Sequence, residues 1–417
     1  MTALAYAALW VFVFSVPWER ILVLPGVSII PKVTGAVAVS LALLAAVMSG
    51  RFRRWHPFHV AALLFVLWAG LVLLIQLTGS RLPAKFWTWP QLLLATWMIW
   101  ELAPSEGRLR GLMAAYVLGA YVAAIDTIVI YRQQAEALRR FAAGGADPND
   151  LAMILALALP MAWYLGMTSH RPVFRWVCRA YLPLCVVAVG LTGSRGGMVA
   201  TTVGLLIVPF SMIRLSPGQL MSAVVMLAAA GALAVVYTPE SLVQRLSSTG
   251  TELEGGRIGG RGKLWKAGLE AFGEKPIIGY GTGAFREAIR PMLGDAAQVA
   301  HNAFISVLVE QGIVGLLLYL AMFIAVFLAL MGLPRLERRF ALVLMATLLV
   351  TMQPLTWEDR RAVWFVLAAI LGLAVARFSG VAAPPRVRPA EPPRQPAMAR
   401  PVGRGVPGWS DARESTR

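Results

Sequence analysis

The chain has 417 residues, of which 58% are hydrophobic and 14% are charged, and its mean hydropathy is +0.68. These values exclude a soluble domain and favour a polytopic membrane protein, because apolar runs of membrane length recur along nearly the whole chain. The formal net charge is +17. The arginines lie in short loops and in the tail, a pattern typical of topology signals and lipid contacts rather than of nucleic-acid binding.

Apolar run lengths predict an all-α protein with about twelve transmembrane helices and one large loop domain. We expect these helices at residues 3–17, 33–48, 58–78, 85–102, 109–131, 149–167, 177–193, 196–213, 218–237, 301–330, 338–354 and 362–378. The first residues lack a basic segment, so we expect the first span to be retained and not removed as a signal peptide.

The connections between these spans alternate in charge. Arginines gather on every second connection, at Arg51, Arg53, Arg54, Arg108, Arg110, Arg171, Arg175, Arg179, Arg214, Arg335, Arg338 and Arg339. The positive-inside rule places those connections and both termini in the cytoplasm. His56, His59 and His170 fall in the same basic loops, where we expect them to be solvated or to face lipid. His301 is then the only histidine expected on the outer face.

Composition divides the chain into four parts. Residues 1–237 and 301–378 hold the N-terminal and C-terminal transmembrane helices. Residues 238–300 contain eight Lys/Arg and seven Asp/Glu among many glycines, which predicts a folded, lid-like periplasmic loop. Residues 379–417 are rich in proline and arginine, so they cannot bury a core and are expected to form a disordered cytoplasmic tail.

The stretch from His301 to Leu330 organises the outer face. We predict one continuous helix, which places Gly312 and Gly315 within about 40° of His301 and offers another helix a small-residue seam. Glu310 points the opposite way and is not expected to be a partner of His301. A histidine at the mouth of such a helix can be a general base, a metal ligand or an ordinary interfacial residue.

Two basic, glycine-containing segments share the expected outer face. The Thr192-Gly193-Ser194-Arg195-Gly196 turn offers a planar guanidinium for phosphate, although Arg195 can equally be an interfacial anchor. Gly259-Gly260-Arg261-Gly262-Lys263-Leu264-Trp265 and the following Pro276–Phe285 combine glycine, basic and aromatic residues. Such a combination suits a sugar-phosphate ligand, since aromatic rings stack on sugars and arginines bind phosphate.

Acidic residues lie at the outer ends of two further helices. Asp147-Pro148-Asn149-Asp150 precedes a predicted helix, and its aspartates are expected mainly to cap it. Asp126 lies about five residues inside the outer end of another helix. A membrane carboxylate is often functional, and pairing with Arg132 or Arg195 explains it equally well. A basic outer cavity with one histidine and several arginines suits a lipid-linked diphosphate.

These motifs resemble the O-antigen ligase and polymerase superfamily. The residues that carry the resemblance are Gly193-Ser194-Arg195-Gly196, Arg261 with Trp265, Pro276–Phe285, His301-Asn302 with Glu310 and Gly312, and Asp147-Pro148-Asn149-Asp150-Leu151-Ala152. The resemblance implies a bacterial inner-membrane glycosyltransferase with a periplasmic active site and an undecaprenyl-diphosphate-linked glycan as donor.

By the same resemblance, His301 matches the histidine proposed as general base on the acceptor hydroxyl. Arg195 and Arg261 match the arginines that hold the diphosphate, and Arg257 competes with Arg261 for that role because the local alignment is uncertain in a glycine-rich segment. The residues expected to support the site are Asn302, Asp126, Asp150 and Trp265.

The resemblance leaves the acceptor open. In the ligase branch the glycan passes to a sugar hydroxyl of lipid A-core, and in the polymerase branch it passes to another lipid-linked repeat unit. A lipid-glycan transporter is the alternative from a different class. We expect no cofactor and no metal ion, since the sequence has no metal-ligand spacing and arginines can stabilise a diphosphate leaving group.

Overall fold

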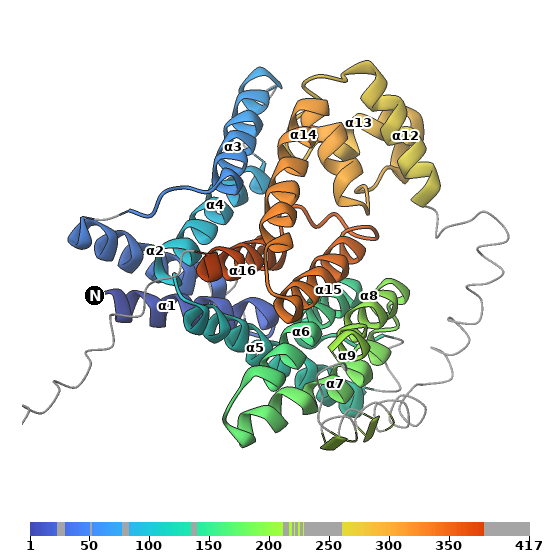
Figure 1. Cartoon of the computed structure of the whole chain (residues 1–417). Helices are drawn as coiled ribbons and strands as arrows, with labels where there is room; N and C mark the ends of the chain where they lie inside the picture. Colours follow the sequence, from blue (N-terminus) through green and yellow to red (C-terminus); the bar gives the residue numbers. More distant parts are fainter. Residues whose placement is uncertain are drawn as a thin grey trace, which may run out of the picture. The chain divides into compact units, whose positions relative to one another are not determined.

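The computed structural model of the protein is built from helices (Figure 1). It describes residues 1–22, 30–50, 52–76, 83–134, 140–211 and 261–378, with isolated positions between 217 and 228. All the continuous ranges belong to one unit, Met1–Ser379. Within these described ranges every regular element is a helix, which confirms the all-α prediction.

Most predicted spans correspond closely to described helices. The N-terminal helices are α1 (Thr2–Ser15), α2 (Ile30–Ser49), α3 (Pro57–Gln76), α4 (Ala84–Leu102), α5 (Glu106–Gln134), α6 (Pro148–Thr168), α7 (Pro172–Thr192), α8 (Arg195–Leu205) and α9 (Ile207–Ser211). The C-terminal helices are α14 (Ala303–Met331), α15 (Arg335–Thr351) and α16 (Arg361–Phe378). The predicted span 218–237 lies largely outside the described residues, as does the tail 379–417.

Six of the described helices are long and apolar enough to cross a membrane, judged by length and composition. They are α2, α3, α5, α6, α7 and α14. Other predicted spans, such as the 14-residue α1 and the 11-residue α8, are shorter. The chain is therefore consistent with a multi-pass membrane protein, with fewer full-length spans among the described helices than the sequence predicts.

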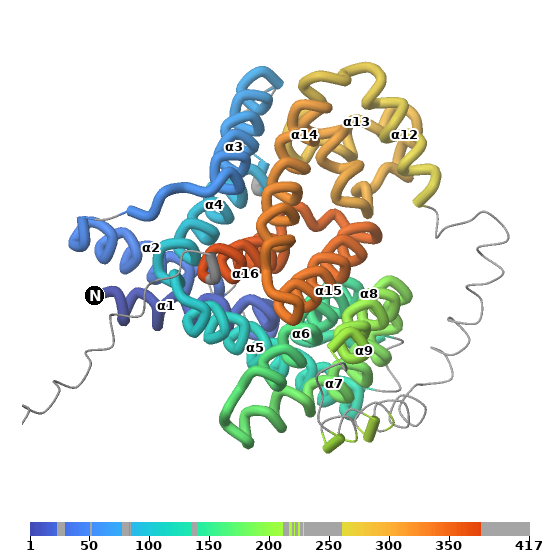
Figure 2. The backbone as a smooth tube through the Cα atoms, viewed as in Figure 1, coloured from blue at the N-terminus to red at the C-terminus, as the bar shows by residue number. Residues whose placement is uncertain are grey.

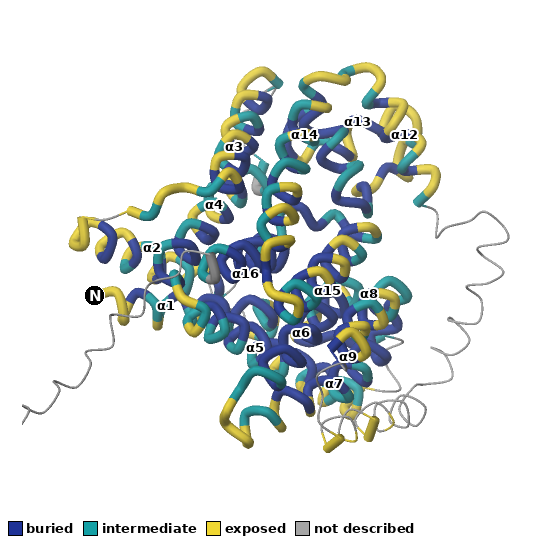
Figure 3. The backbone as a smooth tube through the Cα atoms, in the orientation of Figure 1, coloured by how far each residue is buried: buried dark blue, intermediate teal, exposed yellow. Residues whose placement is uncertain are grey.

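Helix α6 lies at the centre of the helical array. It packs against α5, α7, α8 and α15, and Figure 3 draws nearly all of it as buried. Its residues from Leu151 to Leu165 are apolar on every side and almost wholly inaccessible. A helix that is hydrophobic all round is stable only where neighbours cover every face. The start of α6 is thereby held in a fixed place by its neighbouring helices.

Helix α14 is broken at Gly312, where the sequence predicts a continuous helix. Gly312 has φ 66° and ψ −171°, a conformation open to glycine. The Pro276–Gly281 segment fills the break: Tyr280 N–H donates to Val309 O, and Ile313 N–H donates to Pro276 O. A Cβ on Gly312 would lie 2.1 Å from Ile277 O. At Gly312 the expected helix seam is thus the packing site of a non-helical turn segment.

The predicted seam is correct at Gly315, one turn further along. A Cβ on Gly315 would lie 3.3 Å from Trp68 Cδ1 of α3, and α3 runs beside α14 (Figure 2). The Trp68 indole N–H donates to Gln311 O at 2.9 Å, which satisfies a carbonyl next to the helix break.

Residues 261–300 form a helical layer with its own small core. It contains α12 (Arg261–Glu274), α13 (Phe285–Leu293) and a short 3₁₀ turn (Gly294–Ala296). Leu264, Ala267, Phe285 and Ile289 pack together and reach Val309 of α14. This layer leads directly into His301.

Contacts join several of the basic connections. Arg53 N–H donates to Glu101 Oε1 at 3.0 Å, Arg110 Nη2 lies 3.3 Å from Tyr164 OH, and Arg339 Nη1 donates to Phe210 O. Each contact joins two regions that the arginine pattern assigns to the same side of the membrane. One expectation for this side is wrong: His59 is buried within α3, with its ring 4.8 Å from that of Trp100.

Candidate functional site

His301 lies in a strained turn immediately before α14, and not within the helix as predicted. Its φ of 48° is the only positive value of a non-glycine residue in the described chain. Such a conformation costs about 1–3 kcal/mol and persists where the surroundings enforce it, often at functional sites. Asn302 caps α14 by accepting the N–H groups of Phe304 and Ile305, both at 3.0 Å.

Three hydrogen bonds enforce this turn. His301 N–H donates to Thr356 Oγ1 at 3.0 Å, and the side-chain amide of Asn302 donates to Gln353 Oε1 at 3.1 Å. The Trp265 indole N–H donates to Ala300 O at 2.9 Å. Asn302 and Trp265, expected to support the site, thus hold the backbone on both sides of His301.

His301 and Arg261 line the same cavity, of about 310 Å³. Lys263, Leu264, Leu293, Ala296 and Gln298 complete its walls. Among the residues that the structure describes, neither the imidazole of His301 nor the guanidinium of Arg261 forms a hydrogen bond or an ion pair. Both groups are therefore available to a ligand. We refer to this space as the His301 cavity.

Electrostatics favour a neutral imidazole in the His301 cavity. Partial burial lowers the pKa of His301 from its usual 6.5, and the positive charge of Arg261 lowers it further, while Asp147 and Asp150 act in the opposite direction. Burial also lowers the pKa of Arg261, against the pull of Asp147. A neutral imidazole can accept a proton, as a general base must.

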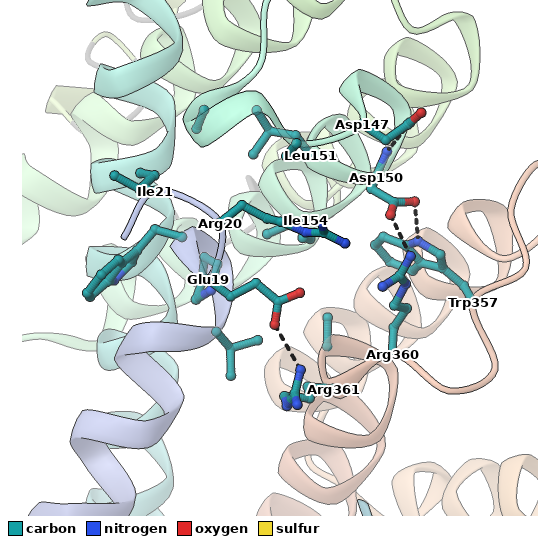
Figure 4. Close-up of a pocket in the computed structure, with 16 residues that line it drawn as sticks. Glu19, Arg20, Ile21, Asp147, Asp150, Leu151, Ile154, Trp357, Arg360 and Arg361 are labelled. Carbon is teal, nitrogen blue, oxygen red and sulfur yellow. Dashed lines mark hydrogen bonds and ion pairs between the residues drawn. The ribbon is translucent and has the colours of Figure 1, made fainter. Parts of the chain in front are cut away.

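The two aspartates at the start of α6 have different roles. Asp147 caps the helix, since its Oδ1 accepts the N–H groups of Asn149 at 2.8 Å and Asp150 at 3.2 Å. Asp150, also expected to cap, instead forms an ion pair with Arg360 at 2.7 Å and accepts from the Trp357 indole at 3.0 Å (Figure 4). The capping interpretation is therefore confirmed for Asp147 and incomplete for Asp150.

Sequence reasoning missed the connection between α15 and α16. It supplies Trp357 and Arg360, and the next residue, Arg361 at the start of α16, pairs with Glu19 at 2.9 Å in the same small pocket (Figure 4). The signal was present: Glu358, Asp359, Arg360 and Arg361 are four consecutive charged residues between two apolar helices. They occur on a connection that the arginine pattern assigns to the outer side, where arginine is unexpected.

The same connection reaches the Arg195 turn. Gly193 ends α7 with φ 58°, and Ser194 caps α8 by accepting Gly197 N–H. A Cβ on Gly196 would lie 3.0 Å from Pro354. Arg195 is half-buried at the first position of α8. The connection therefore reaches Gly196, the residue after Arg195, through Pro354, and the backbone of His301 through Thr356, while Arg195 is not among the residues that line the His301 cavity.

The remaining residues predicted for the site are Asp126 and Arg257. Asp126 accepts the N–H of Gly144 at 3.0 Å, which gives this carboxylate a structural contact, and its pairing with Arg132 or Arg195 stays a prediction. Arg257 lies outside the described residues. Arg140, which the sequence did not single out, donates to Asn149 Oδ1 and Thr192 O, both at 2.8 Å. It thereby joins the Asp147 and Arg195 segments.

Glu310 pairs with Lys85, in agreement with the expectation that it is not a partner of His301. Its Oε2 lies 2.7 Å from Lys85 Nζ, and the same ammonium lies 2.5 Å from Glu358 Oε1. Ser306 Oγ donates to Glu358 Oε1 at 2.6 Å. We call Lys85, Ser306, Glu310 and Glu358 the Lys85 cluster. It ties α4, α14 and the α15–α16 connection together.

Comparison with known proteins supports the O-antigen ligase superfamily. Residues 180–320 match the family described as O-antigen ligase, a range that includes Arg195, Arg261 and His301. The chain is also 29% identical over 220 residues to an O-antigen ligase of Pseudomonas aeruginosa, a match that covers 50% of this chain and 49% of that protein. The chain thus spans about half the length of this curated relative.

Proposed function

We propose that the protein is an O-antigen ligase-type glycosyltransferase. It moves a glycan from undecaprenyl diphosphate to a sugar hydroxyl of lipid A-core at the periplasmic face of the inner membrane. The main support is the His301 cavity, where an imidazole whose pKa is lowered and an arginine without an ion partner among the described residues line one space. The match of residues 180–320 to the O-antigen ligase family supports the same reaction class.

In the proposed reaction, His301 removes the proton from the acceptor hydroxyl as its oxygen attacks the anomeric carbon of the donor glycan. A new glycosidic bond forms, and the bond from the anomeric carbon to the diphosphate oxygen breaks. The electron pair leaves with undecaprenyl diphosphate, while the proton stays on the imidazole until it passes to solvent. A positioned general base of this kind contributes about 10²–10⁴ in rate.

Arg261 and Arg195 hold the diphosphate in this proposal and stabilise its growing negative charge, without a metal ion. Arg261 has a second effect. Its charge lowers the pKa of His301 in the free protein. A bound diphosphate would counter that charge, so the imidazole becomes a stronger base once the donor is in place.

The proposed orientation places residues 238–300 in the periplasm and both termini in the cytoplasm. It rests on the alternating arginines and the positive-inside rule. The contacts between basic connections, such as Arg339 with Phe210, support the placement of these connections on one common side. A probe cysteine replacing Gly255 should react with a membrane-impermeant thiol reagent from outside, whereas one replacing Arg388 should not. The opposite labelling pattern would overturn this orientation.

Purified protein in detergent tests the reaction. With a lipid-linked glycan and lipid A-core, we expect a glycosylated lipid A-core product that survives EDTA and is lost in His301→Ala. Lys266→Gln is the matched control, because Lys266 lies on α12 but is 82% exposed and pairs with Glu270. Elongation of the lipid-linked glycan alone would assign a polymerase. Movement of intact lipid-linked glycan between leaflets, without bond formation, would assign a transporter.

A further inference from the structure

We propose that Thr356 is a positioning residue for His301 in the reaction proposed above. Its hydroxyl oxygen accepts the backbone N–H of His301 at 3.0 Å, across 55 residues of the chain. The bond holds the His301 backbone in the turn that brings the imidazole to the His301 cavity, beside Arg261. The role of the imidazole as a base rests on the proposed function, whereas its placement by Thr356 does not.

The backbone of His301 does not favour this turn by itself. Its φ of 48° lies in the left-handed region, where the Cβ of a residue other than glycine comes too close to a backbone carbonyl oxygen. The next residue, Asn302, has an extended backbone with φ −162° and caps α14. Two successive residues therefore hold different conformations, and contacts from outside the turn select them.

Thr356 makes its contact on the peptide of His301 itself. The other side-chain contact from the same connection runs from the Asn302 amide to Gln353 Oε1 at 3.1 Å, one residue further along. Gln353 is exposed, whereas Thr356 is half-buried. Water can replace a partner at an exposed position more easily than at a half-buried one. Thr356 therefore constrains His301 more directly than Gln353 does.

The residues on both sides of Thr356 fix its position. Leu355 and Trp357 are buried. The Trp357 indole N–H also donates to Asp150 Oδ1 at 3.0 Å, which ties the connection to the start of α6. A hydroxyl held in this way can impose a conformation on the turn, because it does not move to follow its partner.

The placement of the imidazole affects both its reach and its pKa. Burial and the charge of Arg261 lower the pKa of His301, while Asp147 and Asp150 oppose them, and each effect depends on where the ring lies. If the turn relaxes to a negative φ, the ring leaves its place beside Arg261 and its pKa returns toward 6.5. Its distance from the acceptor hydroxyl changes as well, and a displacement of about 1 Å can cost about 10²-fold in rate.

Variants of Thr356 test the effect on the reaction. Thr356→Val keeps the shape but removes the oxygen, so we expect kcat to fall by about 10 to 10²-fold. KM for the donor should be nearly unchanged, because the arginines hold the diphosphate. Thr356→Ser keeps the hydroxyl and should retain most of the parent kcat. Thr351→Val is the matched control and should be silent, since the Thr351 hydroxyl donates to Leu348 O within α15.

An NMR titration of histidine-labelled protein in detergent tests the placement without substrate. The chain has four histidines, and the resonance that is lost in His301→Ala belongs to His301. We expect the pKa of His301 to rise toward 6.5 in Thr356→Val and to keep its parent value in Thr356→Ser and Thr351→Val. Thr356→Ala also lacks the oxygen and takes the place of Thr356→Val if that variant does not fold.

The two measurements separate this proposal from the proposed function. A changed pKa with unchanged glycosyl transfer would sink the role of His301 as base and leave its placement by Thr356 assigned. An unchanged pKa in Thr356→Val would overturn the placement, whatever happens to kcat. Equal effects of Thr356→Val and Thr356→Ser would overturn it too, because serine retains the hydroxyl.

Discussion

The Lys85 cluster and the His301 cavity both contain a basic side chain, but this side chain is ion-paired in the cluster and faces a cavity in the other region. In the Lys85 cluster, one ammonium contacts two carboxylates, and Gly283 N–H gives Glu310 a further hydrogen bond at 2.9 Å. In the His301 cavity, Arg261 and His301 face open space and have no such partners among the described residues. A buried charge must be paired to be tolerated. A charge left facing a cavity is available to a ligand.

Both regions depend on the same two elements. The N-terminal half of α14 carries Ser306 and Glu310 on one face and begins just after His301. The α15–α16 connection supplies Glu358 to the Lys85 cluster and Thr356 to the His301 turn. The comparison therefore predicts that variants of the cluster change stability first, and that variants of the cavity change activity alone.

Removal of the proposed base should give the largest effect. We expect His301→Ala to reduce turnover by about 10²–10⁴, with donor affinity nearly unchanged because the arginines hold the diphosphate. Turnover and donor affinity are measured separately on the purified protein. His301→Lys should also be inactive; retained activity in that variant would favour a cationic phosphate ligand. A fully active His301→Ala protein would return His301 to an ordinary interfacial residue.

Breaking the Lys85 cluster should chiefly reduce stability. Lys85→Met leaves Glu310 and Glu358 without their shared cation, and a buried pair broken in this way costs about 3–5 kcal/mol. The free energy of unfolding in detergent measures the effect. Adding Glu358→Gln should recover part of the loss, because one of the two negative charges is removed. If Lys85→Met proves as stable as the parent protein, the cluster does not stabilise the packing of these helices.

Local rules predict much of this molecule. The helix start at Asp147 follows from a capping residue before proline, and the boundaries of most helices follow from apolar run length. The sequence also placed His301 and Arg261 on one face, through the expected order of spans and loops. Both residues do line one cavity.

Local rules could not predict which residues pair when they are far apart in the sequence. Lys85 meets Glu358 across 273 residues, and Asp150 meets Arg360 across 210. Such pairs depend on how the helices assemble and not on any local pattern. The break at Gly312 is similar, since Gly312 could equally continue the helix and its conformation is set by the Pro276–Gly281 segment that packs there.

Arg261 should contribute a smaller, geometry-dependent effect. Arg261→Lys keeps the charge but loses the planar pair of donors, so we expect donor affinity to fall about tenfold, with a further fall in turnover. Lys266→Gln on the same helix is the control and should be silent, because Lys266 is exposed and its pairing with Glu270 is a surface contact. An equal loss in both variants would indicate a general effect on α12 and not a diphosphate contact.

The smallest expected effect is a shift in pH dependence. A base must be unprotonated to act, so kcat/KM should rise with pH through the pKa of His301 in the free protein. Burial and Arg261 lower that pKa, so the rising limb should lie below pH 6.5 and activity should be level near neutrality.

Two variants test the causes of this pKa. Arg261→Gln removes one cause of the lowering and should move the limb to higher pH, while Asp150→Asn removes an opposing charge and should move it to lower pH. The position of the limb is the readout, since both variants also change its height. Activity that instead falls with pH over this range would mean that the protonated imidazole is the active form. A limb that does not move in either variant, or that moves in the reverse direction in each, would show that these two charges do not set the pKa of His301.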